Sequence, residues 1–339
     1  MNNKIGWGFI GASNIAREYM VAAVRAQQGH EVVAVASGSM DRATAFSRDH
    51  QIVGAYDSVH ALLADPAVHA VYISTTNDLH CEQVQAAAAA GKHVLCEKPL
   101  ALSLADAQRM VAACREAGVL MATNHHLRNA ATHRKVRELL QSGAIGRPLF
   151  ARVFHAVYLR PQLQGWRIAR PQAGGGVILD VVVHDADILR FIFGVEPVEA
   201  IGMNQSAFLA QGGLEDGVMA VLRLDNGVLA QIHAAYTVRH ADTGLEIHGD
   251  SGSIFAHDVM TQRAIGEVFL RDKQGERLVP VKHQDLYISG VASFCAAMRG
   301  EGLPAATGDD GVHSLAAALA VVEACRTGAA VRVDPGPKI

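Results

Sequence analysis

The sequence predicts two domains, an α/β domain with a doubly wound parallel sheet followed by an α+β domain with an open, mostly antiparallel sheet. Three observations predict this fold class. The chain has 339 residues, which is more than one ordinary domain needs. Apolar runs of strand length alternate with helical segments over residues 1–124, as in parallel sheets. Beyond residue 148, strand-like runs follow one another without helices between them, as in antiparallel sheets.

The first part contains strands and helices in alternation. We expect strands at residues 5–10, 31–37, 70–75, 93–98 and 119–124, and helices at 14–26, from Asp41 onward, at 79–92 and at 103–118. Ser103 is a suitable N-cap for the last of these helices, and Gly118 is suited to end it.

The second part changes its pattern. A long strand is expected at 148–159, an apolar helix at 177–194, several strands between 196 and 283, and a final helix at 307–327. Asp225-Asn226-Gly227 is a strong signal for a hairpin between two of those strands. We therefore expect domains at 1–124 and 125–339, and leave open whether the final helices pack back on the first domain.

The composition excludes several classes of protein. Half of the residues are hydrophobic, and 30 Lys and Arg balance 33 Asp and Glu, which argues against overall disorder, a nucleic-acid surface and a polybasic membrane patch. The five cysteines form no CxxC pair, the start lacks the pattern of a secretory signal, and no apolar run reaches transmembrane length. These features predict a soluble cytoplasmic protein. The 17 histidines are about double an average share.

The turn from Gly11 to Ala16 lies where the first strand meets the first helix, so its backbone N–H groups can bind a dinucleotide pyrophosphate. The usual fingerprint is Gly-x-Gly-x-x-Gly/Ala, and this chain has Ser13 at the second position and Ala16 at the third. By itself the turn fits a plain strand-to-helix connection equally well. Its place at the start of the first βαβ unit favours dinucleotide binding.

The end of the second strand indicates which dinucleotide is bound. NAD-binding domains usually carry an acidic residue there, whereas this chain has Ser37, Gly38 and Ser39, with Arg42 in the next turn. A hydroxyl and a guanidinium suit a 2′-phosphate, so we expect NADP(H) rather than NAD. The alternatives are that Arg42 faces water and that Asp41 binds the ribose.

Two further segments carry candidate chemistry. Lys98 lies at the carboxyl end of the strand expected at residues 93–98 and is expected in the crevice where ligands bind in such sheets, although a solvated lysine before Pro99 is the plainer alternative. Asp180 and His184 are four residues apart on an apolar helix and thus share a face. They fit a proton donor with an acidic neighbour, a core histidine with internal partners, or two ligands of a metal for which no third ligand is visible.

Together these motifs resemble the Gfo/Idh/MocA oxidoreductases. The resemblance is carried by the Gly-Ala-Ser turn at 11–13, the segment from Thr75 to His80, Glu97-Lys98-Pro99, and Gly174-Gly175-Gly176 with Asp180 and His184. It extends over nearly the whole chain. It implies a Rossmann domain followed by an α+β domain that carries the substrate site on one side of its sheet.

The resemblance also implies the residues of the site. It implies pyrophosphate binding by Gly11, Ala12, Ser13, Asn14 and Ile15, and 2′-phosphate binding by Ser37, Gly38 and Arg42. It implies that the path from adenosine to nicotinamide is lined by Thr75, Thr76, Asn77, His80, Glu97, Lys98 and Asn124, and that Trp166, Arg167 and Tyr287 close over it from the second domain.

The implied reaction is NADPH-dependent reduction of the ketone of an anhydro keto sugar. His184 would donate the proton, Lys98 would polarise the carbonyl, and Asp180 would bind a sugar hydroxyl or orient the site. The proton donor, His184 or Lys98, remains open, as does the choice between a monomer and a homo-oligomer. No metal, nucleic acid or membrane partner is expected.

Two other functions stay open at this point. One is another sugar or polyol dehydrogenase of the same family, and the other is a non-catalytic regulator that senses NADP. The missing second glycine of the fingerprint leaves the turn geometry open, although the Ser13 hydroxyl can donate to phosphate. Among the remaining histidines, His125 and His126 are candidate neighbours of the nicotinamide, whereas His30, His50, His60 and His69 are expected at the surface.

Overall fold

The computed structural model describes residues 4–336, and within them the chain forms two compact units. The first contains residues 4–125 and Tyr287–Val312, and the second contains His126–Leu286 and His313–Gly336. The chain therefore returns to the first unit after completing most of the second. No helix within residues 4–336 is long and apolar enough to cross a bilayer.

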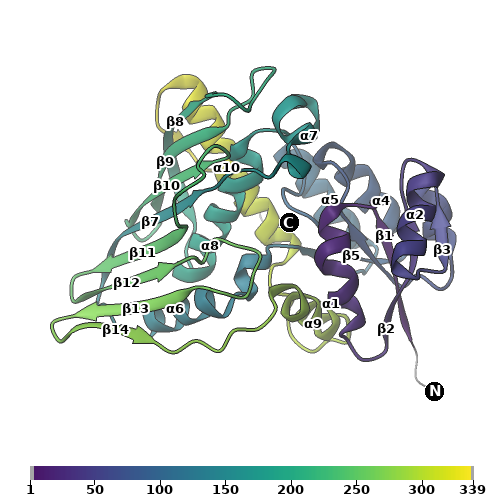
Figure 1. The fold of residues 1–339 in the computed structure, drawn as a ribbon, viewed down its shortest axis with the longest axis horizontal. Helices are drawn as coiled ribbons and strands as arrows, with labels where there is room; N and C mark the ends of the chain where they lie inside the picture. The colour runs from purple at the N-terminus through teal and green to yellow at the C-terminus, as the bar shows by residue number, and fades with distance from the viewer. Residues whose placement is uncertain (1–3, 337–339) are drawn as a thin grey trace. The chain divides into compact units, whose positions relative to one another are not determined.

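The first unit is built on a six-stranded parallel sheet in the order β3-β2-β1-β4-β5-β6 (Figure 1). Its strands are β1 Ile5–Ile10, β2 His30–Ala36, β3 Gly54–Tyr56, β4 Ala70–Ile73, β5 His93–Cys96 and β6 Met121–Thr123. Its helices include α1 Val21–Arg25, α2 Met40–His50, α3 Val59–Ala64, α4 His80–Ala89, α5 Leu104–Glu116 and α9 Leu286–Met298. This order confirms the doubly wound α/β sheet.

Capping residues and terminating glycines predicted most helix ends in the first unit. Ser103 caps α5, because its hydroxyl oxygen accepts from the Asp106 N–H at 3.1 Å, and Gly118 lies just beyond that helix at φ +66°. The helix expected at 14–26 differs, since a π-helical turn at Ala16–Met20 precedes α1. The short β3 and α3 were not predicted, because neither is long enough to show a clear hydrophobic period.

The second unit contains a nine-stranded sheet in the order β14-β13-β12-β11-β7-β10-β9-β8-β15 (Figure 1). Its strands are β7 Pro148–Ala156, β8 Pro197–Gln205, β9 Gly217–Leu224, β10 Leu229–Ala235, β11 Gly244–Gly249, β12 Gly252–His257, β13 Glu267–Asp272, β14 Gly275–Val279 and β15 Val331–Arg332. Neighbours are antiparallel except β7 and β10, which run parallel. The mostly antiparallel sheet is thus confirmed, and Asp225-Asn226-Gly227 does join β9 to β10, with Gly227 at φ +86°.

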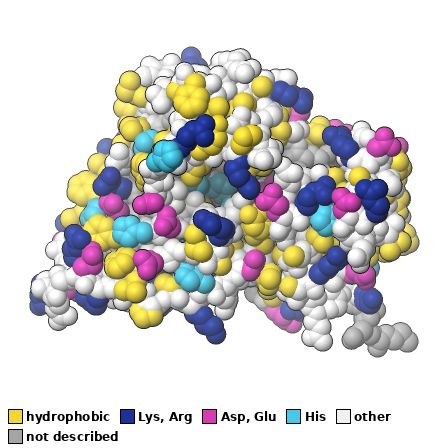
Figure 2. Space-filling model, in the orientation of Figure 1, with side chains coloured by type: hydrophobic (Ala, Val, Ile, Leu, Met, Phe, Trp, Pro, Cys, Tyr) yellow, Lys and Arg dark blue, Asp and Glu magenta, His cyan; other side chains and the backbone are white. Residues whose placement is uncertain are grey.

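The two faces of this sheet differ in burial. Alternate residues such as Val153, Ile232 and Leu222 are buried, and α6 Ala131–Gln141 contacts β12 and β13. On the other face the pairing register brings Phe150 and Met219 to the surface, where each is more than half exposed. Figure 2 shows basic and acidic side chains interspersed over the visible surface, without a large field of one sign.

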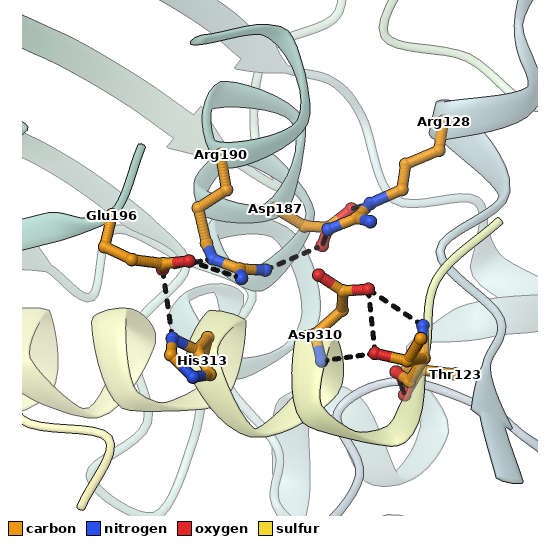
Figure 3. A network of polar contacts seen from close by, with 8 residues as sticks. Thr123, Arg128, Asp187, Arg190, Glu196, Asp310 and His313 are labelled. Carbon is orange, nitrogen blue, oxygen red and sulfur yellow. Dashed lines mark hydrogen bonds and ion pairs between the residues drawn. The ribbon is translucent and has the colours of Figure 1, made fainter. Parts of the chain in front are cut away.

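A network of ion pairs stabilises the second unit (Figure 3). Arg128 donates two hydrogen bonds, of 2.8 and 2.7 Å, to the buried Asp187 carboxylate. Arg190 lies 3.6 Å from Asp187 and donates to Glu196, which also contacts His313 at 3.1 Å. Burial alone would raise the pKa of Glu196, but the hydrogen bonds from Arg190 and His313 outweigh it and lower the pKa to about 2.

Figure 3 also labels two residues of the first unit, Thr123 and Asp310. The Thr123 hydroxyl donates to the carbonyl oxygen of Thr307 at 3.1 Å. The Asp310 carboxylate accepts from the N–H and the hydroxyl of Thr307, at 2.8 and 2.9 Å. These bonds fix the start of α10 Gly308–Thr327 to the end of β6. The helix expected at 307–327 is confirmed.

Candidate active site

The turn after β1 is built around Gly11. Its φ is +111°, and a Cβ there would approach the carbonyl carbon and oxygen of Ser74 to 2.9 and 3.0 Å. Only glycine fits such a conformation and such a close approach. The Ser13 hydroxyl accepts from the Ala16 N–H at 3.2 Å and lies 2.8 Å from the Ser74 hydroxyl. Ser13 therefore caps the helix and ties the turn to β4, an internal role beyond the phosphate contact expected for it.

The Arg42 guanidinium lies near the end of β2. Ser37 and Gly38 follow the strand, and a Cβ at Gly38 would stand 3.5 Å from a terminal nitrogen of Arg42. Arg42 is exposed on α2, and within residues 4–336 no carboxylate forms an ion pair with it. By contrast, Arg48 on the same helix pairs with Asp49 at 3.3 Å. The guanidinium beside Gly38 is thus free to bind an anionic group.

The segment from Thr75 to His80 is held by internal bonds. The His80 side chain is fully buried, with Nδ1 3.0 Å from the carbonyl oxygen of Pro99 and Nε2 3.3 Å from that of Thr75. Burial lowers its pKa. The Thr75 hydroxyl donates to Gln83 at 2.7 Å. These contacts place His80 between the ends of β4 and β5, and its part in lining the cofactor path stays a prediction.

Glu97 and Lys98 follow β5 directly. One carboxylate oxygen of Glu97 accepts from the Tyr72 hydroxyl and from the Asn124 amide, both at 2.6 Å. Burial raises the pKa of Glu97, against the effect of these two bonds and of the Lys98 charge. Glu97 thus fixes Asn124 beside Lys98 at the carboxyl ends of three strands. Tyr72 was not predicted. The sequence feature that could have identified it is a hydroxyl group within an otherwise apolar strand.

Tyr287 lies in the first unit, whereas the resemblance placed it in the second domain. Its side chain is buried, and its ring stacks on that of Tyr19 with 4.5 Å between centroids. Tyr19 belongs to the π-helical turn that follows the Gly11 turn. The physical reason for the difference is this aromatic contact at the start of α9. It secures that helix to the turn from Gly11 to Ala16, called the dinucleotide-type turn below.

In the second unit, the three glycines at 174–176 begin the helix of Asp180. A Cβ on Gly175 would come within 2.8 Å of the Trp166 carbonyl oxygen. At Gly176, with φ +101°, a Cβ would collide with the Glu215 carboxylate. That carboxylate accepts from the Ile178 N–H at 3.0 Å and so satisfies one free donor at the helix start. A larger residue at position 176 would therefore displace the Glu215 carboxylate from the Ile178 N–H.

Asp180 is held from two sides. Arg167 donates through Nε at 3.1 Å and the Tyr236 hydroxyl donates at 2.8 Å, both to the same carboxylate oxygen. The Arg167 guanidinium also lies 4.6 Å from the centroid of Trp166, its neighbour on α7 Pro161–Ala169. The structure thus brings three predicted site residues together. Tyr236, which is buried and has a strongly raised pKa because of burial and the Asp180 charge, was not predicted.

His184 lies in a cluster of histidines on α8 Val183–Phe193 and its neighbours. Its ring meets that of His126 edge-on at 4.9 Å between centroids and that of His155 at 6.4 Å. His155 Nδ1 is 2.7 Å from the fully buried carboxylate of Asp185. Asp185 therefore contributes a carboxylate to this cluster through His155. Neither Asp185 nor His155 was predicted. The sequence feature that could have identified them is a polar residue at a core position, of a helix for Asp185 and of a strand for His155.

The residues expected to act on substrate are divided between the units. Lys98 stands in the first unit, and Asp180 and His184 stand in the second. Within residues 4–336 no group of three His, Cys, Asp or Glu side chains has the geometry to hold a metal ion.

Two family models match the chain. Residues 5–125 match the oxidoreductase family with an NAD-binding Rossmann fold. Residues 133–255 match the GFO/IDH/MocA C-terminal domain. These matches fall on the parallel sheet of the first unit and on the antiparallel sheet of the second.

Curated relatives extend over most of the chain. The 1,5-anhydro-D-fructose reductase of Ensifer adhaerens is 54% identical over 330 residues, which cover 97% of this chain and 99% of that protein. The myo-inositol 2-dehydrogenase of Thermotoga maritima is 32% identical over 272 residues, which cover 77% and 78% of the two chains.

Solved structures share the fold. An aldose-aldose oxidoreductase from Caulobacter crescentus has a TM-score of 0.89 at 23% identity, covering 97% of this chain and 99% of that one. A 3-ketoreductase from Actinomadura kijaniata, in complex with NADP and TDP-benzene, has a TM-score of 0.84 at 27% identity, covering 95% and 98%. The resemblance expected from the motifs is confirmed: this chain belongs to the Gfo/Idh/MocA family of oxidoreductases.

Proposed function

We propose that the chain catalyses the NADPH-dependent reduction of the C2 ketone of 1,5-anhydro-D-fructose to 1,5-anhydro-D-mannitol. The 54% identity to a reductase named for this substrate supports the choice of sugar. The observation in the structure that carries the proposal is the carboxylate of Asp180, held between Arg167 and Tyr236 one helical turn before the histidine cluster. That arrangement offers an oriented acceptor for a sugar hydroxyl and a proton donor on one helix.

The first unit fits the cofactor. Gly11, which has no Cβ, lets the turn approach Ser74 closely at the place where a pyrophosphate binds in such folds. Arg42, exposed and without an ion pair within residues 4–336, suits the 2′-phosphate that distinguishes NADPH from NADH. The 3-ketoreductase from Actinomadura kijaniata, solved with NADP, supports the same assignment. When bound, NADPH supplies the hydride for the carbonyl carbon.

The side chains then have separate roles. The Lys98 ammonium polarises the ketone oxygen, on which negative charge develops. Asp180, oriented by the hydrogen bonds that Arg167 and Tyr236 donate to its carboxylate, accepts a hydrogen bond from a sugar hydroxyl. His184 donates the proton to the ketone oxygen and completes the alcohol. His155, held by Asp185, lies next to His184 and supports its position.

The test is consumption of NADPH, followed at its nicotinamide absorbance, with a panel of 1,5-anhydro-D-fructose, glucosone, an inosose and simple ketones. We expect turnover with 1,5-anhydro-D-fructose and 1,5-anhydro-D-mannitol as the product, identified by chromatography. No loss of NADPH with any ketone would refute the reductase and favour a protein that senses NADP.

A second candidate is a polyol dehydrogenase, favoured by the 32% identity to myo-inositol 2-dehydrogenase. The same panel separates the two, because this candidate would reduce the inosose in preference to the anhydro sugar. It would also oxidise myo-inositol with NAD or NADP in the reverse direction.

The proposal includes a cytoplasmic location, since all five cysteines are free thiols and a reducing compartment preserves them. Its partner is a small keto sugar, without nucleic acid or membrane. The exposed apolar side chains of Phe150 and Met219 on the sheet of the second unit provide a surface for a homo-oligomer. Light scattering of the purified chain distinguishes it from a monomer.

A further inference from the structure

A pocket of about 580 Å³ lies in the first unit at the amino ends of its parallel strands. It is lined by the first residues of β1, β2 and β5, by the loops before β4 and β5, and by the end of α9, including Ile5, His30, His69, Lys92, His93 and Arg299. Gly11 and Lys98 follow the carboxyl ends of β1 and β5, at the opposite edge of the same sheet. The pocket is therefore separate from the dinucleotide-type turn.

Three histidines of this pocket are locked in the same way. In each, Nδ1 accepts a hydrogen bond from an N–H group, so the proton of the neutral ring must be on Nε2. The donors are the Trp7 indole for His30 at 3.1 Å, the Gly6 backbone for His69 at 3.0 Å and the Leu120 backbone for His93 at 3.0 Å. Each ring thus keeps a proton on Nε2 as its remaining hydrogen-bond donor.

Protonation of these rings at Nδ1 would break those bonds. Burial lowers the pKa of His30, helped by the charge of Arg299, and burial also lowers the pKa of His93. These two rings are consequently neutral near pH 7 and act as fixed N–H donors rather than as titrating cations. A pocket that presents N–H donors selects ligands with acceptor oxygens.

The permanent charges of the pocket are positive. The Lys92 ammonium donates to the carbonyl oxygens of Val68 and Asp65, at 2.7 and 3.5 Å, and within residues 4–336 it has no ion pair. Arg299 pairs with Glu301 at 2.7 Å, outside the lining. None of the described residues that line the pocket is acidic. The lining therefore favours an anion.

The donors are divided between two ends. Lys92, His93 and His69 belong to the loops and strand starts at β4 and β5, and the backbone N–H of His93 donates to the carbonyl oxygen of His69 at 3.2 Å. His30 and Arg299 lie at β2 and at the end of α9. With strands about 4.8 Å apart, β2 and β5 are separated by about 14 Å in the sheet. Ile5, on β1, provides an apolar surface between them.

We propose that this pocket binds a small organic anion that carries an acidic group at each end, of the sugar bisphosphate or polycarboxylate class. One group is bound by Lys92, His93 and His69, and the other by Arg299 and His30. The apolar middle of the pocket covers the carbon chain. Nothing in this assignment depends on the ketone reduced at the other edge of the sheet.

The test is isothermal titration calorimetry of the full chain at matched ionic strength, with fructose 1,6-bisphosphate, citrate, inorganic phosphate and fructose. We expect binding of one bis-anionic probe per chain, weaker binding of phosphate and none of fructose. Whichever of fructose 1,6-bisphosphate and citrate binds more tightly identifies the source of the anionic groups. Failure of both to bind, or binding of phosphate as tightly as either, would overturn the proposal.

Variants assign the heat of binding to the pocket. Lys92→Met and Arg299→Ala should each weaken binding by about tenfold, because each removes one charge-assisted contact. Arg42→Ala, which alters only the other edge of the sheet, should bind the probe as the wild type does. Circular dichroism checks that each variant is folded, and Arg299→Ala remains informative if Lys92→Met is not. Loss of binding in Arg42→Ala with retention in Arg299→Ala would assign the probe to the dinucleotide-type turn instead.

Discussion

Arg42 offers the sharpest test of cofactor choice. Its guanidinium stands beside Gly38 at the end of β2, and no carboxylate within residues 4–336 competes for it. Replacement by alanine removes a charge-assisted hydrogen bond to the 2′-phosphate of NADPH. Such a bond contributes about 1.5–3 kcal/mol. Because Arg42 is exposed and screened by solvent, the lower end of that range applies, and it corresponds to about a tenfold change in affinity.

The assay is steady-state kinetics with 1,5-anhydro-D-fructose at a fixed, saturating concentration and with NADPH or NADH varied. For Arg42→Ala we expect KM for NADPH to rise about tenfold while kcat stays within about twofold. KM for NADH should not change, since NADH has no 2′-phosphate. Direct titration of NADPH fluorescence gives Kd without turnover and should change by the same factor.

A matched control is available on the same helix. Arg48 is also exposed, but it pairs with Asp49. We therefore expect Arg48→Ala to leave KM for both cofactors unchanged. If Arg42→Ala binds NADPH within twofold of the wild type, the assignment of Arg42 is refuted. If both variants weaken NADPH equally, the effect is one of general surface charge rather than of the 2′-phosphate.

Three further predictions concern the second unit and Lys98. His184→Ala should lower kcat by about 10²–10⁴ and remove one limb of the pH profile, whereas Lys98→Met should lower kcat and keep that limb; unchanged turnover in His184→Ala would exclude it as the proton donor. Tyr236→Phe deletes the 2.8 Å bond to Asp180 and should lower kcat/KM by about fivefold to tenfold, with an unchanged value counting against an oriented carboxylate. The lowered pKa of Glu196 contributes stability above pH 4.5 that is lost as the pH falls toward 2. Chemical denaturation should therefore find Glu196→Gln less stable than the wild type by roughly 1 kcal/mol at pH 7, after allowance for solvent screening, and no less stable near pH 2.

The sequence predicted the fold well where single elements show a clear period or stop signal. The strands expected at 5–10 and 93–98, which form at Ile5–Ile10 and His93–Cys96, and the cap at Ser103 were all readable from local pattern. The prediction failed for elements that are too short to show a period and for residues whose position depends on packing against distant parts of the chain. The three-residue β3 has too few residues for a period, and the return of Tyr287 to the first unit depends on stacking with Tyr19, which is 268 positions earlier in the chain.

For the site, sequence motifs found residues but not their partners. Asp180 was singled out, but the tyrosine that holds it comes from the end of β10 and has no motif. A pairing of Asp180 with His184 stays a prediction, and Asp185, which contacts the neighbouring His155, was not predicted. His69 is exposed as expected, but the hydrogen bond that its ring accepts from the Gly6 N–H at the edge of a pocket was not predicted. Such pairings depend on strand register, which local patterns do not specify.

The π-helical turns at Ala16–Met20 and Ile178–Val182 have a consequence for how this chain tolerates changes in length. A π turn accommodates one more residue than an α turn, because its hydrogen bonds run from i to i+5. Loss of a single residue in either segment would let the helix continue as regular α, with the residues on both sides of the turn kept on their faces, whereas the side chains within the turn would change their azimuths. In the second segment a deletion between Asp180 and His184 would change their spacing from i,i+4 to i,i+3 and so alter how the two side chains lie, although every side chain of the site would still be encoded. At these two places the number of residues is as much a determinant of activity as their identity.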